Sequence, residues 1–176
     1  MKKVAALVLF ACLFSSNVYA NSEITNPPSV SVPTVTKSNG VTIEKATTYV
    51  KSLTIKNGKL YGTFDYVEWY FGDNAQKAYQ KDCPKCSGYD GKGHIPSMYY
   101  IRNHNKKLRT YPIAQNAEVV LQTNSLGKDG NFQWNEKVNM KTFQQFAQKR
   151  GIPYNLPFHI EVKNGVVTKI TEQYIP

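Results

Sequence analysis

Two cysteines, Cys83 and Cys86, are the side chains whose type and spacing most clearly suggest chemistry. They stand in the stretch DCPKCSGYDGKGH, which ends at His94. A pair with this spacing is compatible with a disulfide, with half of a zinc site or with a redox pair. Structural zinc needs four ligands, usually from two such pairs, so His94 and His104 would have to supply the missing two.

We expect a structural disulfide between Cys83 and Cys86, and we expect neither a metal ion nor another cofactor. The expectation rests on export, because exported proteins meet an oxidising environment. Redox-active pairs typically stand at the start of a helix, which lowers the pKa of the thiol, whereas this pair follows a predicted helix and precedes a glycine-rich loop. A metal knuckle and a redox pair are the alternatives.

Basic and aromatic residues are concentrated in the stretch MYYIRNHNKKLRTYPI, residues 98–113. If residues 103–106 form the turn of a hairpin, Arg102 lies opposite Lys107, and strand alternation gives the hairpin two faces. One face is apolar and is expected to point to the core: Tyr99, Ile101, Leu108 and Thr110. The other face is cationic and aromatic: Tyr100, Arg102, Lys107, Arg109 and Tyr111.

This cationic aromatic face has two interpretations. Guanidinium groups bind phosphate or carboxylate through paired hydrogen bonds and tyrosine rings stack, so the face fits a polyanion or a sugar. Alternatively, the arginines pair with Asp65, Glu68 or Glu118 on the protein surface. Two cations placed opposite each other need compensation, which predicts an acidic neighbour, a tyrosine ring or a bound anion beside them.

Familiar catalytic motifs are missing from the sequence: there is no Gly-x-Ser-x-Gly elbow, phosphate-binding glycine-rich loop or His-Glu-x-x-His helix. Asp65 and Glu68 are close in sequence, but their odd spacing on a strand points them to opposite faces. A hydrolase acting on the cell envelope would need Glu68, His159 or Glu161 to converge with tyrosines in a cleft. The sequence therefore favours a protein without catalytic activity.

The N-terminus indicates export. Residues 1–20 combine Lys2 and Lys3, an apolar run too short to span a bilayer, and small residues before a cleavage site at Ala20. We predict a removed secretory signal, with lipidation of Cys12 as the alternative. In both cases the protein is secreted or extracytoplasmic, and the mature chain has no transmembrane helix.

Composition divides the remaining chain. Residues 21–40 are rich in Pro, Ser and Thr, which predicts a flexible spacer, and residues 41–176 suffice for a single β-rich domain. The chain has 22 Lys and Arg against 12 Asp and Glu, a formal charge of +10. This excess favours an anionic cell-envelope polymer or surface as the partner and leaves nucleic acid open, because charge does not choose between polyanions.

Two Asn-Gly pairs, Asn57-Gly58 and Asn164-Gly165, separate runs rich in β-branched and aromatic residues. Asn-Gly is the strongest short-range hairpin signal, so each pair predicts two antiparallel strands. Enrichment in Tyr, Ile, Val and Trp predicts further strands at residues 98–102, 107–113, 117–123 and 131–135.

Two segments show the helical period instead. In GDNAQKAYQKD, Asp73 is the expected N-cap, and Pro84 follows the run. In NMKTFQQFAQKRG, Asn139 is the expected N-cap, and Gly151 fits the C-terminal end. Hairpins with two short helices predict a mainly β fold, a small antiparallel barrel or strongly coiled sheet, OB-like at a coarse level, with helices at its ends.

Three blocks, EWYFGDNAQKAY, YYIRNHNKKLRTYPI and GVVTKITEQYIP, resemble the recurring segments of a group of small secreted or lipid-anchored bacterial proteins of unassigned function. The resemblance spans about residues 49–176 and implies an exported single domain, to which CPKCSGYDGKGH is a local addition. The residues themselves favour an exported, non-catalytic binding module that docks an anionic polymer through the cationic aromatic face. The alternative is the cell-envelope hydrolase.

Overall fold

The computed structural model describes residues 29–88, 90–151 and 156–175. The predicted signal, Cys12 and residues 21–28 of the predicted spacer lie outside this part of the chain. None of the helices in the described part is long and apolar enough to cross a membrane. The elements are, in chain order, β1 (Val30–Ser31), β2 (Thr34–Ser38), β3 (Val41–Lys56), β4 (Lys59–Phe71), α1 (Asp73–Asp82), β5 (Tyr99–Arg102), β6 (Leu108–Leu121), β7 (Glu136–Val138), α2 (Met140–Lys149), β8 (Pro157–Lys163) and β9 (Val166–Glu172).

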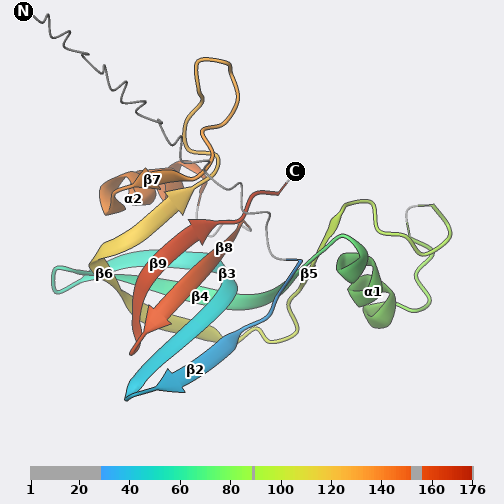
Figure 1. Cartoon of the computed structure of the whole chain (residues 1–176), viewed down its shortest axis with the longest axis horizontal. Coiled ribbons are helices and arrows are strands. Elements are labelled where there is room, and N and C mark those ends of the chain that lie inside the picture. Colours follow the sequence, from blue (N-terminus) through green and yellow to red (C-terminus); the bar gives the residue numbers. More distant parts are fainter. Residues whose placement is uncertain (1–28, 89, 152–155, 176) are drawn as a thin grey trace, which may run out of the picture.

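Strands β3, β4, β6, β9 and β8 close into a ring, and the fold is mainly β, as predicted (Figure 1). β3 pairs antiparallel with β4 and β8, β8 pairs antiparallel with β9, and β4 pairs antiparallel with β6. A parallel pairing of β6 with β9 completes the ring. This arrangement confirms the expected mainly β fold, a small sheet that is OB-like at a coarse level, and the parallel β6–β9 pair departs from the antiparallel barrel or coiled sheet that we expected. The other strands extend it: β2 pairs with β3, β1 and β5 pair with β4, and β7 pairs with β6.

Both predicted Asn-Gly hairpins form. Asn57 and Gly58 join β3 to β4 at φ values of 50° and 71°, and Asn164 and Gly165 join β8 to β9 at 49° and 78°. A turn with two positive φ values matches the right-handed twist of the strands that it joins.

A third Asn-Gly pair, Asn39 and Gly40, also has positive φ and joins β2 to β3. Residues 30–31 and 34–38, expected to belong to the flexible spacer, form β1 and β2. Their Val and Thr residues favour extended backbone, and β3 and β4 offer edges for pairing. Every side chain of β2 is exposed, which explains why the composition of this segment resembles that of a spacer.

Strand β6 joins two segments that were expected to be separate strands, residues 107–113 and 117–123. Its first part pairs with β4 and its later part with β9, with an irregularity between Ile113 and Glu118. The strand predicted at residues 131–135 is wrong. These residues form one arm of a loop in which Leu126 and Phe132 make an isolated antiparallel bridge, and β7 begins after them.

The predicted hairpin of residues 98–113 does not form. β5 pairs with residues 68–71 of β4, and β6 pairs with residues 61–65 of the same strand, so β5 and β6 lie one after the other along β4. Arg102 lies opposite Glu68 and not opposite Lys107. An opposite charge across the strand pair is more favourable than a second cation, which gives the physical reason for this register.

Helix α2 covers one end of the ring. Its Phe143 and Phe146 side chains are buried in the core cluster. The predicted ends of the helix are confirmed. The Oδ1 atom of Asn139 accepts a hydrogen bond from the Thr142 backbone N–H at 2.9 Å, and Gly151 has a φ of 68° beyond the last turn.

Helix α1 does not cover the other end of the ring, contrary to our expectation. It packs beside β4 and β5, to one side of the ring (Figure 1). Asp73 is the first residue of α1, and its N-cap is Gly72, which offers no side-chain hydrogen bond. An acidic side chain in the first turn still stabilises the helix through its dipole. The prediction for α1 was thus right for the helix and wrong for the capping residue.

The core lies inside the ring, against α2. On the outer side of the sheet, Trp69 is fully buried and stacks on Tyr99, with 5.2 Å between the ring centroids. Burial of such large apolar side chains is the main favourable contribution to folding. The core cluster contains Ala46, Val50, Phe64, Tyr66, Ile113, Val119, Leu121, Phe143, Phe146, Phe158, Ile160, Val162, Val167 and Ile170.

Gly62 of β4 gives the first test of this packing. A Cβ atom at this position would lie 2.8 Å from Cε2 of the fully buried Phe64 and 3.2 Å from Cδ1 of Ile113. We expect Gly62→Ala to lower the free energy of unfolding by about 1–3 kcal/mol, measured by urea denaturation. In a double-mutant cycle, Phe64→Leu should relieve part of this loss. Strict additivity would contradict the proposed clash.

Candidate functional site

Arg102, at the centre of the predicted cationic face, is bound by two carboxylates. Its Nε and Nη2 atoms donate to the two carboxylate oxygens of Asp82 at 2.7 and 3.0 Å, and its Nη1 atom donates to Glu68 at 2.7 Å. The Arg102 side chain is 13% exposed. A contact through two parallel N–H groups, as with Asp82, is the strongest form of an arginine–carboxylate pair.

Two tyrosines complete this group, which we call the Arg102 cluster: Glu68, Tyr70, Asp82, Tyr100 and Arg102. The Tyr100 hydroxyl donates to Asp82 at 3.1 Å, and the Tyr70 hydroxyl donates to Glu68 at 2.5 Å. Burial and the contact with Glu68 raise the pKa of Tyr70 to about 12. The Arg102 hydrogen bond lowers the pKa of Asp82. Burial opposes ionisation of Glu68, but the hydrogen bonds from Tyr70 and Arg102 outweigh it and lower the pKa of Glu68.

The Arg102 cluster contains one cation against two carboxylates, so it does not present a free positive charge. Glu68 was one of the acidic partners expected for the arginines. Asp82 was not, because it stands at the end of α1 and approaches Arg102 only when that helix packs against β5. The assignment of Tyr100 and Arg102 to ligand binding stays a prediction, and this geometry gives it no support.

The other three residues of the predicted face lie further along, on or beside β6. The Cζ atom of Arg109 lies 4.1 Å from the centroid of the buried Tyr66 ring. Tyr111 packs against the core cluster, and its hydroxyl donates to Glu44 at 3.0 Å. Lys107 is exposed. Arg109 and Tyr111 are thus turned toward the core.

The two faces of this segment are consequently reversed along β6. Leu108, expected in the core, is 53% exposed, and Thr110 is exposed as well. Tyr99 and Ile101 of β5 are half-buried. Strand alternation is correct, but a period of two residues separates two faces without saying which one is buried.

Of the residues proposed for a hydrolase, Glu68 lies on the other face of the sheet from His159 and Glu161. His159 and Val67 both lie opposite Thr47 in the sheet, so their side chains are on the same face. Glu68 follows Val67 in β4, and its side chain is therefore on the opposite face. The ring nitrogens of His159 contact the Thr47 hydroxyl at 3.0 Å and the Gln173 side-chain oxygen at 2.7 Å. Burial lowers the pKa of His159, against the opposing effect of the Gln173 contact. Glu161 pairs with an exposed lysine.

The sulfur atoms of Cys83 and Cys86 lie at disulfide distance, with 5.3 Å between the Cα atoms. This turn directly follows Asp82, so it fixes the end of α1 that reaches the Arg102 cluster. The Nδ1 atom of His94 lies 2.6 Å from a carboxylate oxygen of Asp90. Within the described residues, no group of three or more His, Cys, Asp or Glu is placed to hold a metal ion.

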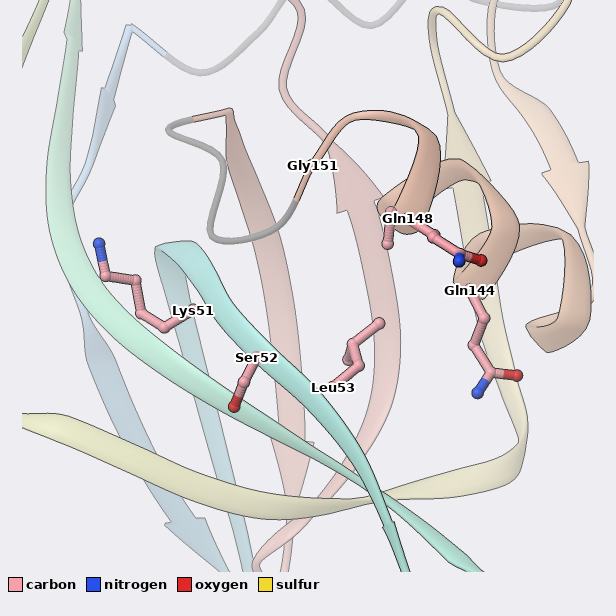
Figure 2. A pocket seen from close by; sticks show the side chains of 7 residues that line it. Lys51, Ser52, Leu53, Gln144, Gln148 and Gly151 are labelled. Carbon is pink, nitrogen blue, oxygen red and sulfur yellow. The ribbon is translucent and has the colours of Figure 1, made fainter.

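Two hollows flank α2. The first, of about 570 Å³, lies between β3 and α2, whose side chains line it (Figure 2). Among the described residues that line it, Lys51 is the charged one, and its Nζ atom is 3.9 Å from Asp65. The rest of the lining consists of small, apolar or amide side chains: Ser52, Leu53, Gln144, Ala147, Gln148 and Gly151.

The second hollow, which we call the loop–helix groove, has a volume of about 550 Å³ and lies between α2 and the loop that follows β6. It combines two cations, Lys149 and Arg150, with two phenyl rings, Phe132 and Phe146. None of the described residues that line it is acidic. The lining residues are Thr123, Asn124, Leu126, Phe132, Thr142, Gln145, Phe146, Lys149 and Arg150.

The loop wall of this groove is held at its base by side-chain hydrogen bonds. The Gln122 side-chain oxygen accepts from the Asn135 backbone N–H at 3.0 Å, and its Nε2 atom donates to Asn135 Oδ1 at 3.2 Å. Asn124 and Ser125 donate to Glu136 at 3.1 and 2.6 Å. Because these contacts join the two arms of the loop, Leu126 and Phe132 are presented from a fixed base.

A buried carboxylate ties the loop to the helix. Glu172 accepts hydrogen bonds from the backbone N–H groups of Gln122 and Thr123 at 2.6 and 3.0 Å, and from the Thr123 hydroxyl at 2.6 Å. Arg150 in turn donates to that hydroxyl at 2.8 Å through Nη2, and its guanidinium lies over the Phe146 ring. The Nε and Nη1 atoms of Arg150 have no hydrogen-bond acceptor among the described residues.

This groove is what sequence reasoning missed. Its residues come from the segments 123–132 and 142–150, which become neighbours only when α2 packs on the ring. One signal was present: the turn-rich stretch TNSLGKDGNFQW contains three large apolar residues. In the structure Leu126, Phe132 and Trp134 are 60%, 37% and 51% exposed, which is unusual for such side chains gathered in one loop.

No family model, curated protein or solved structure matches this chain. The resemblance to small secreted or lipid-anchored bacterial proteins stays a prediction.

Replacing Arg102 tests the structural role of the Arg102 cluster. We expect Arg102→Gln to lower the free energy of unfolding at pH 7 by about 2–3 kcal/mol, because two carboxylates lose their cation. The exposed Lys107→Gln control should change it by no more than about 0.5 kcal/mol. Carboxylates with a lowered pKa stabilise the fold above their unfolded pKa of about 4, and this contribution is lost on acidification. The acid-induced loss should therefore be smaller in Arg102→Gln; equal losses would argue against the cluster.

The lowered pKa of His159 predicts a second pH dependence. Its unfolded pKa is about 6.5, so below that pH the unfolded chain takes up a proton that the folded protein resists. Stability should fall as the pH drops from 7 through the folded pKa of His159. Urea denaturation at pH 7 and pH 5 should show this loss in the parent protein and in the exposed-site control His104→Gln, and a smaller loss in His159→Gln. A loss of unchanged size in His159→Gln would refute the assignment.

Proposed function

We propose that this chain is an extracytoplasmic, non-catalytic binding module that docks an anionic cell-envelope polymer in the loop–helix groove. The observation that carries the proposal is the pairing of Lys149 and Arg150 in a hollow whose described lining contains no carboxylate. Cations in a concave site attract an anion more strongly than the same cations on an open surface, because the low-dielectric walls focus their field.

The arrangement of the two cations supports this role. Arg150 is held at one nitrogen by Thr123 and retains Nε and Nη1 for a carboxylate or phosphate. Lys149 is exposed and has no ion-pair partner among the described residues. Charge-assisted hydrogen bonds of this kind contribute more to binding than neutral ones. In the Arg102 cluster, by contrast, the cation already pairs with the carboxylates of Asp82 and Glu68.

The remaining features agree with an exported binding module. Without Lys2 and Lys3 of the predicted signal, 20 Lys and Arg still face 12 Asp and Glu, and this excess attracts anionic polymers at long range. A cysteine pair at disulfide distance is compatible with an oxidising compartment. A hydrolase finds less support, because Glu68 lies on the other face of the sheet from His159 and Glu161, and each of the three side chains has a protein partner.

Removing the two groove cations tests the proposal. We expect Lys149→Gln/Arg150→Gln to weaken binding to immobilised inorganic polyphosphate and to polygalacturonate by about tenfold or more, as expected for lost charge-assisted contacts. The dependence of binding on NaCl concentration should flatten, because fewer counterions are exchanged. Binding is measured by elution from each polymer and by titration at two salt concentrations.

The matched control removes the same charge elsewhere. Lys56 and Lys59 are exposed and flank the β3–β4 turn, and Lys56→Gln/Lys59→Gln should reduce binding only slightly. Urea denaturation of both variants accounts for any loss of folding, including the loss of two cations that favour the C-terminal end of α2. Equal weakening in the two double variants would mean that net charge, and not the groove, binds the polymer.

A further inference from the structure

We propose that the ligand of the loop–helix groove is a glycan chain bearing carboxylate groups, with the Phe132 ring as the platform on which a sugar ring stacks. This inference rests on the proposed function and adds the chemical class of the ligand. It is carried by the apolar side chains that stand beside the two cations, which a purely electrostatic site would not need.

Phe132 belongs to a continuous apolar stripe. It is paired with Leu126 by a backbone bridge, and its ring lies 6.3 Å from the Trp134 ring. Trp134 in turn contacts Tyr174 edge to face at 4.8 Å between centroids. Large apolar side chains exposed in such number are typical of a binding surface. A sugar ring suits this stripe because it has an apolar C–H face for an aromatic ring and hydroxyls at its rim.

The polar residues of the groove match the rim of a sugar. Gln145 is exposed, and its side-chain amide has no partner among the described residues. Asn124 donates to Glu136, and the Thr142 hydroxyl donates to Asn139, so each retains an acceptor oxygen toward a ligand hydroxyl. A few placed polar groups around apolar walls are the usual composition of a site for a small polar ligand.

The charges indicate carboxylate groups on that glycan. Arg150 and Lys149 lie in the same groove as Phe132, so one chain can stack and form an ion pair within a single site. The walls are already ordered by the contacts of Glu172 and Gln122, and binding then requires little further ordering.

A lipid bilayer fits the stripe less well. Figure 1 shows the loop between β6 and β7 projecting away from the ring, and its tip, residues 127–131, carries Lys128 and Asp129. Insertion of the tip would bury both charges, which is costly, whereas a ligand lying in the groove leaves them in water. Single-stranded nucleic acid shares the stacking and the anion chemistry, and it is therefore an arm of the test.

The experiment separates the ring from the charge with three probes. Oligogalacturonate has sugar rings and carboxylates, its methyl-esterified form has the rings without the charge, and inorganic polyphosphate has charge without rings. We expect Phe132→Ala to weaken oligogalacturonate binding about tenfold and to leave polyphosphate binding unchanged. Lys149→Gln/Arg150→Gln should weaken both. Phe132→Tyr keeps an aromatic platform and should restore oligogalacturonate binding.

Intrinsic fluorescence reports where the glycan lies. The chain has two tryptophans, and Trp69 is fully buried whereas Trp134 is 51% exposed. Saturation with oligogalacturonate should shift the emission of the parent protein. The shift should disappear in Trp134→Phe, which keeps an aromatic ring beside Phe132. Unchanged urea denaturation of each variant establishes that its fold is intact.

The outcomes distinguish this inference from the proposed function. If the two cations are needed but Phe132→Ala binds oligogalacturonate as the parent does, the module binds anions without recognising a glycan, and the inference fails alone. If oligodeoxythymidylate or anionic phosphatidylglycerol vesicles bind more tightly in a Phe132-dependent way, the groove belongs to that partner instead. If the cation variant binds every probe as the parent does, the proposed function fails as well.

Discussion

Strand β6 pairs with β4 along one edge and with β9 along the other, and the rest of the structure depends on this double pairing. The parallel contact with β9 requires a crossover connection, and α2 lies within it. The helix is thereby brought over the end of the ring, where Phe143 and Phe146 enter the core. The loop that leaves β6 is placed beside the helix by the same closure, and the loop–helix groove forms between them.

Strand β4 organises the other half of the molecule. Its length of 13 residues allows β6 to pair with its first part and β5 with its last part. The β5 segment and α1 form an extension beside the ring, held together by the bidentate contact of Arg102 with Asp82 and by the contact of Arg102 with Glu68. Arg102, which stood at the centre of the predicted ligand-binding face, joins these elements through its carboxylate contacts. Arg109 lies over the Tyr66 ring.

The cations of the proposed binding site, Lys149 and Arg150, lie in the loop–helix groove, and a buried carboxylate orders the residues next to Arg150. Glu172 is 2% exposed, and within the described residues its carboxylate accepts hydrogen bonds from Gln122 and Thr123, at the start of one loop. The Thr123 hydroxyl, held by Glu172, accepts a hydrogen bond from Arg150. A charged group so deeply buried is tolerated because it is fully engaged, and the same contacts order both walls of the groove before any ligand arrives.

The sequence by itself determined the features that depend on a few neighbouring residues. Three such features were predictable because each depends on local backbone geometry. They are the two Asn-Gly turns at residues 57–58 and 164–165, the Asn139 cap, and the close approach of Cys83 to Cys86. These signals, with strand alternation, sufficed for a mainly β, OB-like fold.

Only the tertiary structure decided which face of residues 98–113 is buried and which cations remain available. Alternation defines two faces of a strand, but the choice between them depends on where the ring closes. Arg102 meets Asp82, 20 residues away, and Glu172 meets Thr123, 49 residues away. Such contacts follow from the packing of whole elements, and no local preference of the residues involved encodes them.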